Sequence, residues 1–78
     1  MPTAADLTPR QLAVAKLVAV ALPDKRIAHE LGMSTRRVRT HITALADLLG
    51  CDPSRNVRVQ VAMWWREQLP DIRRWPAA

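Results

Sequence analysis

The chain has 78 residues, one cysteine, two histidines and a formal net charge of +5. A lone cysteine excludes an intramolecular disulfide and, with only two histidines, offers no donor set for a structural zinc ion. One small domain must then be stabilised by helix packing and by any partner subunit. The basic charge favours a polyanionic partner without choosing among DNA, RNA and an acidic protein.

The N-terminal stretch MPTAADLTPR lacks the positive segment and apolar run of a signal peptide, and no part of the chain approaches membrane-spanning length. We therefore expect a cytoplasmic protein with no membrane contact and with a flexible segment over residues 1–6. A helix over residues 9–21 follows, with Thr8 as its hydroxyl cap and Pro9 at its first position. Its apolar face repeats at i, i+3, i+4 and i+7: Val14, Leu17, Val18 and Ala21.

A second helix is predicted over residues 24–32. Asp24 is its candidate N-cap, and its apolar positions are Ile27, Ala28 and Leu31. Gly32 ends it, because a left-handed residue without Cβ costs least at a helix end. Ser34 then caps the next helix with its hydroxyl.

The third predicted helix, residues 35–49, has two contrasting faces. Its apolar stripe is Val38, Ile42, Leu45 and Leu49, and the opposite arc holds Arg36, Arg37, Arg39, Thr40, Thr43 and Asp47. A short helix joined through a glycine turn to a helix with a basic, hydroxylic front predicts a helix-turn-helix. The alternative is an ordinary amphipathic helix with a solvated charged face.

A fourth helix is predicted over residues 53–68, with Asp52 as its preferred cap and Asn56 as the alternative. Its apolar residues occupy more than one face: Val57, Val61 and Trp64 on one side, Val59 and Met63 on another, with Trp65 adjoining. This surplus indicates a second contact surface, although both tryptophans are also explained as caps on a small core. Pro70 is expected to break the helix, leaving Ile72 and Trp75 as candidate anchors of the tail.

Three stretches resemble the LuxR/FixJ-type (GerE-like) DNA-binding family: LTPRQ from Leu7, KRIAHELGMS from Lys25 and TRRVRTHI from Thr35. The resemblance covers about residues 7–65. It implies an all-α, compact four-helix domain, whose core we place at residues 7–69 of a single domain over 1–78. It also implies dimerisation through the fourth helix, and we expect Val57, Val61, Trp64 and Trp65 to form that interface. If the chain is complete, it carries no receiver or ligand-binding domain and we expect it to resemble the stand-alone members of the family. The alternative is a fragment of a longer regulator.

The basic, hydroxylic face of the third helix and the family resemblance together lead to a hypothesis about function. We expect a sequence-specific regulator of transcription that binds double-stranded DNA with its third helix in the major groove. Arg36, Arg39, Thr40 and Thr43 are the candidate base contacts. By analogy with the family, Thr8, Lys25, Thr35 and Arg37 face phosphates. His41 is assigned either to a phosphate or to half-buried packing.

No catalytic constellation is visible. The chain has no tyrosine, no glycine-rich phosphate loop and no metal-spaced cluster, and its two serines are explained as helix caps. We therefore expect no enzyme, no cofactor, no metal and no small-molecule ligand. The alternative function is a protein-interaction module that binds a transcription protein through the Val/Trp face of the fourth helix.

Overall fold

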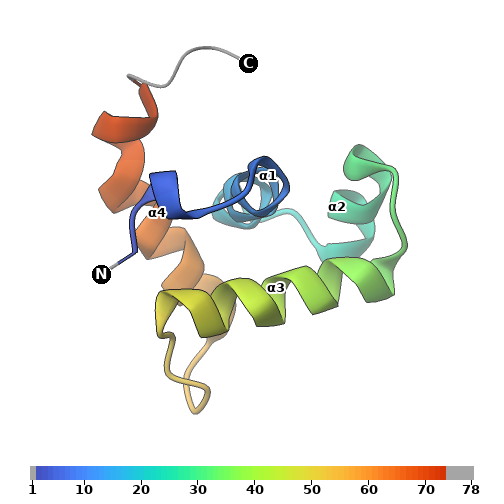
Figure 1. The fold of residues 1–78 in the computed structure, drawn as a ribbon. Coiled ribbons are helices and arrows are strands. Elements are labelled where there is room, and N and C mark those ends of the chain that lie inside the picture. Colours follow the sequence, from blue (N-terminus) through green and yellow to red (C-terminus); the bar gives the residue numbers. More distant parts are fainter. Residues whose placement is uncertain (1, 74–78) are drawn as a thin grey trace.

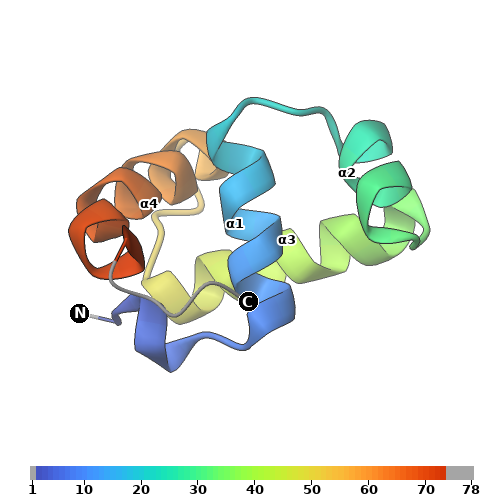
Figure 2. The same ribbon diagram turned by 90° about the horizontal axis from the view of Figure 1, so that it is seen from above.

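The structure, a computed structural model, describes residues 2–73 and is all-α over that range. After a 3₁₀ turn, η1 (Ala4–Asp6), come α1 (Pro9–Ala19), α2 (Asp24–Leu31), α3 (Thr35–Leu49) and α4 (Val57–Arg73). In Figure 1, α3 runs beneath α1, which is seen end-on, with α2 at one end of α3 and α4 at the other. Seen from above, α1 crosses α3 between the other two helices (Figure 2). The predicted all-α fold of four helices is confirmed.

The core lies where these helices meet. Its fully buried side chains include Ile27, Leu45, Val14, Val38 and Val61, so each helix contributes at least one. The stripe predicted on α3 is buried as a whole in this core. No helix of the described residues is long and apolar enough to cross a membrane.

The ends of α2 and α3 are set by local hydrogen bonds. Gly32 and Gly50 adopt left-handed conformations, with φ of 63° and 69°, and end the two helices as glycine allows. The hydroxyl of Ser34 accepts the amide of Arg37 at 3.1 Å, which confirms the predicted cap. Asp24, however, is not an N-cap: Pro23 occupies that position, and its carbonyl accepts the amide of Ile27 at 3.0 Å. The carboxylate of Asp24 is thereby free for other partners.

The end of α1 differs from the prediction. The helix begins as expected: the Thr8 hydroxyl accepts the amide of Gln11 at 3.1 Å, and the Gln11 side chain accepts the amide of Thr8 at 2.9 Å. It ends at Ala19, two residues early, and Ala21 is exposed with φ of 64°. Apolar periodicity alone extended the helix too far, because the chain must turn there to reach α2.

The start of α4 is also corrected. The preferred cap, Asp52, instead accepts the amide and hydroxyl of Ser54 at 2.9 and 2.7 Å, inside the loop that precedes the helix. The alternative is confirmed: α4 begins at Val57, and the Asn56 side chain accepts the amide of Val59 at 3.2 Å. The helix then continues past Pro70 to Arg73. Proline's fixed φ is itself helical, so the helix can continue through it, although the residue lacks an N–H and its ring crowds the carbonyl four residues earlier. Trp75 lies outside the described residues, and the side chain of Ile72, the other candidate anchor of the tail, is not described either.

The N-terminal segment is packed against α4, where flexibility was expected. Ala4 and Leu7 are buried in the core. The indole nitrogen of Trp64 donates to the carbonyl of Pro2 at 3.0 Å, and the amide of Ala4 donates to the side chain of Gln68 at 3.2 Å. These contacts tie the start of the described chain to a helix more than 60 residues away.

Candidate nucleic-acid interface

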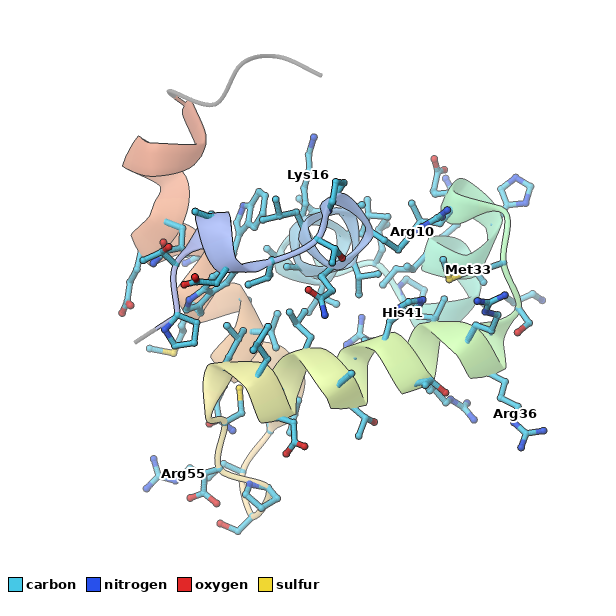
Figure 3. All side chains as sticks on the ribbon, in the orientation of Figure 1. Arg10, Lys16, Met33, Arg36, His41 and Arg55 are labelled. Carbon is cyan, nitrogen blue, oxygen red and sulfur yellow. The ribbon has the colours of Figure 1, made fainter. Side chains whose placement is uncertain are left out.

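One face of α3 carries the predicted base-contacting residues. Arg36, Arg39, Thr40 and Thr43 are all exposed, and together with Ala44 and Asp47 they line one shallow depression on the surface. They lie opposite the buried stripe, since a helix that buries every third or fourth residue turns the remainder outward. Figure 3 shows Arg36 extending away from α3 and from the rest of the domain. The structure therefore brings the four predicted residues onto one accessible surface.

The chemistry of this face suits base edges. Arginine offers a fork of donors, and threonine offers a methyl group and a hydroxyl. The Thr40 hydroxyl donates to the carbonyl of Arg36 at 3.1 Å, which commits its proton to the helix and leaves its methyl group as its distinctive outward feature. Asp47 adds one carboxylate to the same depression. The surface is thus basic toward the start of α3 and acidic toward its end.

Arg39 is held by an acid from another helix. Its Nε donates to Oδ2 of Asp24 at 3.3 Å, although the Arg39 side chain remains 74% exposed. The other oxygen of Asp24 accepts a hydrogen bond from Arg58 of α4. Sequence reasoning placed Asp24 at a helix cap and missed both contacts, which span 15 and 34 residues.

A second depression lies where α1, α2 and α3 meet. It is lined by Arg10, Leu31, Gly32, Met33, Arg37 and His41. Arg10, Met33 and His41 are labelled in this region of Figure 3. Nη1 of Arg10 donates to the carbonyl of Leu31 at 3.2 Å, which directs its guanidinium toward the turn. Two predicted phosphate-contacting residues, Arg37 and half-buried His41, therefore share a basic hollow with Arg10.

Arg10 was not among the predicted residues. The signal available was its place in the LTPRQ stretch, two residues after Thr8, but the sequence does not show that α1 passes near His41. The other predicted phosphate contacts are more dispersed. Thr8 and Lys25 are exposed near the starts of α1 and α2, half-buried Thr35 opens α3, and none of them lines either depression.

The residues expected at a dimer interface on α4 differ in their burial, and α4 also carries exposed apolar side chains outside that set. Val61 is fully buried and Trp64 is 5% exposed, so both belong to the domain's own core. Val57 and Trp65 are half-buried. The exposed pair is Val59 and Met63, at 52% and 59%, one helical turn apart. The surplus apolar surface of α4 therefore lies opposite its core stripe.

Residues outside these surfaces show that the positive charge is not confined to one face. Lys16 projects from α1 on the side away from α3, and Arg55 projects from the loop before α4 (Figure 3). Arg55 pairs with Asp52 at 3.8 Å across an exposed contact of little energetic weight. Between residues 2 and 73 no three His, Cys, Asp or Glu side chains come together as a metal site would require. Positive charge alone therefore does not identify the candidate interface. It is identified also by the depressions on the surface and by the helices that carry the residues.

Comparison with known proteins identifies a family and a relative. The family described as bacterial regulatory proteins, luxR family, matches residues 5–63. The chain is 39% identical over 58 residues to the transcriptional regulatory protein YdfI of Bacillus subtilis (strain 168). The match covers 74% of this chain and 27% of YdfI, so the chain corresponds to about a quarter of that relative's length. No solved structure is significantly similar to the chain.

Proposed function

The chain belongs to the luxR family of bacterial regulatory proteins, and we propose that it is a sequence-specific regulator that binds double-stranded DNA through α3. The observation that carries the proposal is the single depression lined by Arg36, Arg39, Thr40 and Thr43 on the outward face of that helix. Family membership supports DNA-binding regulation of transcription rather than catalysis. Because it acts on DNA, we place the protein in the cytoplasm.

The proposed docking places the N-terminal half of α3 in the major groove. The exposed arc of the helix then faces base edges, while α2 lies across the backbone, as in other helix-turn-helix proteins. Arg36 and Arg39 present guanidinium donors to O6 and N7 of guanine, and Thr40 and Thr43 present methyl groups to thymine. Asp47, nearer the C-terminal end of α3, accepts from a cytosine amino group or repels phosphate and so limits how far the helix is buried.

Phosphate contacts flank this reading surface. Arg10, Arg37 and His41 line one hollow, and we assign it to a backbone phosphate. Lys25 near the start of α2, Thr8 at the start of α1 and Thr35 at the start of α3 supply further contacts to the phosphate backbone. Such contacts fix register and orientation, while the base edges supply sequence information.

A dimer would bring two reading helices to two half-sites. We assign its interface to the outward side of α4, because Val59 and Met63 are large apolar side chains left exposed there. Sedimentation of the free protein and of its complex with DNA tests this assignment. Met63→Glu should shift the equilibrium to the monomer without unfolding it, since position 63 lies outside the core.

The test of function is selection from a library of duplex DNA with a randomised centre, followed by affinity measurements over a range of salt. We expect an enriched motif, and a log affinity that falls by about 0.9 for each phosphate neutralised per log unit of salt. Arg39→Ala should weaken binding to the selected motif by roughly 5- to 150-fold, the value of one good base contact. Lys16→Ala is the matched control, because it removes the same charge from an exposed position on the side of α1 that faces away from α3.

The outcomes separate DNA binding from the alternative, a module that binds a transcription protein through α4. If no motif is enriched, and the weak binding disappears at physiological salt, the arginine face is only a solubilising surface. If Arg39→Ala and Lys16→Ala weaken motif binding equally, α3 is not the reading helix. Partner binding through the apolar side of α4 would show little dependence on salt in either variant.

A further inference from the structure

Asp24 joins three helices through one carboxylate. It is the first residue of α2, where the positive end of the helix dipole favours an acid. Its Oδ2 accepts from Nε of Arg39 on α3 at 3.3 Å, and its Oδ1 accepts from Nη1 of Arg58 on α4. Nη2 of Arg58 also donates to the carbonyl of Leu22, in the connection before α2. The acid is thus fixed on one side and engages the reading helix on the other.

The exposure of the three side chains supports this division of roles. Asp24 and Arg58 are 24% and 35% exposed, whereas Arg39 is 74% exposed. The pair with Arg58 is the sheltered, structural side of the arrangement, which water screens less. The contact with Arg39 lies at the edge of the α3 depression, where DNA would approach.

The contact uses only part of the Arg39 guanidinium. The group has five donors in a planar fork, and Asp24 engages Nε. Among residues 2–68, whose side chains are described, none accepts a hydrogen bond from Nη1 or Nη2 of Arg39. Those two nitrogens form the end of the fork, whose donor pair matches O6 and N7 of guanine. Asp24 therefore holds the Nε side of the guanidinium and leaves its Nη1 and Nη2 donors available.

We propose that Asp24 is a positioning residue that sets base specificity by holding Arg39 in the orientation that reads guanine. The proposal rests on the function proposed above. A long arginine side chain loses much conformational freedom when it binds, and holding it beforehand lowers that cost for one geometry only. The carboxylate also offsets part of the arginine charge, so a phosphate competes less well with a base for the same group.

The main experiment is DNA selection with the whole chain carrying Asp24→Asn, which removes the charge and nearly preserves the shape. We expect the preference for guanine at one position of the motif to fall about fivefold, a fraction of what a complete bidentate contact provides. Affinity for unrelated duplex DNA should rise. Glu30→Gln is the matched control: it makes the same change of charge on an exposed residue of the same helix. It should raise unrelated binding similarly and leave the guanine preference unchanged.

A double-mutant cycle shows whether Asp24 acts through Arg39. In protein that already carries Arg39→Ala, adding Asp24→Asn should have no further effect on base preference. A further loss of preference in that background would mean that Asp24 acts by another route, and the proposal would be overturned. A general weakening of the fold would appear in both backgrounds and would not cancel.

A measurement on the unmodified protein covers the case in which Asp24→Asn does not fold. The side-chain Nε–H groups of Arg39 and Arg36 are compared by nitrogen relaxation in solution, with Arg36 as the reference that extends into solvent (Figure 3). We expect Arg39 Nε to be clearly more ordered than Arg36 Nε before DNA is added. Equal mobility of the two groups overturns the proposal.

The results distinguish this inference from the function on which it rests. If the unmodified protein enriches no motif, the proposed function fails and the inference fails with it. If it enriches a motif that Asp24→Asn recognises with unchanged preference, the function stands and only the role of Asp24 is refuted. A uniform gain of affinity for all sequences in Asp24→Asn also refutes it, because the acid would then act through charge alone.

Discussion

Replacing Trp64 with phenylalanine should destabilise the domain even when it is monomeric. Trp64 is 5% exposed, and its indole nitrogen donates to the carbonyl of Pro2 at 3.0 Å. Phenylalanine buries less ring surface, at a cost of about 1 kcal/mol. It also removes the hydrogen bond, which contributes about 1 kcal/mol. A loss of about 2 kcal/mol is large beside the roughly 4–12 kcal/mol expected for the unfolding of 78 residues.

The assay is thermal unfolding followed by circular dichroism over a wide range of protein concentration. For a domain of this size, about 2 kcal/mol lowers Tm by roughly 8–16 °C. The control is Met63→Ala, on the exposed side of the same helix, which should change stability by less than about 0.5 kcal/mol in the monomer. If Trp64→Phe melts like the unmodified protein, the reasoning is refuted. It is also refuted if the loss of stability disappears on dilution, because Trp64 would then stabilise an interface between chains.

Three further predictions concern single positions. Ala21→Gly should raise the free energy of unfolding by about 0.5–1 kcal/mol, because Ala21 has φ of 64°, and a lower stability would show that this strain is absent. Hydrogen bonds from the Ser54 side chain and backbone lower the pKa of Asp52, so the stability it contributes is present above the ordinary carboxyl pKa and is lost as pH falls through the lowered value. Ser54→Ala should raise the pKa of Asp52 in a carboxyl NMR titration, and an unchanged value would contradict this cause. Burial raises the pKa of the Cys51 thiol, so Cys51 should react with iodoacetamide more slowly near pH 8 than it does in the unfolded chain; equal rates would contradict it.

The pairing of Asp24 with Arg39 affects how Arg39 would bind in the proposed complex with DNA. Arg39 is exposed enough to reach DNA, yet it is already paired with an acid from α2. The Arg39 side chain would therefore be partly ordered before DNA binds, so it would lose less conformational entropy on binding. Arg36, which extends from the same depression, has more freedom to adapt. The two arginines should differ in their contributions: Arg39 should discriminate strongly between bases, and Arg36 should accept more than one base at its position.

The sequence alone determined the features whose causes lie within one helical turn. The bounds of α3, its cap at Ser34 and the glycine ends at positions 32 and 50 all depend on hydrogen bonds between residues three to five apart. The polar arc of α3 follows from the same periodicity, because a helix that buries one stripe must expose the other. Family membership was readable as well, since its motifs lie in these locally determined stretches.

Only the tertiary structure decided which groups from different helices meet. The side of α4 that enters the core depends on the angle at which that helix packs against α1, so Trp64 lies inside and Met63 outside although both are large and apolar. The pairing of Asp24 with Arg39, the approach of Arg10 to His41 and the docking of Pro2 on Trp64 join residues 15 to 62 positions apart. No local pattern encodes such distances, because they depend on packing that forms only when the whole core is assembled.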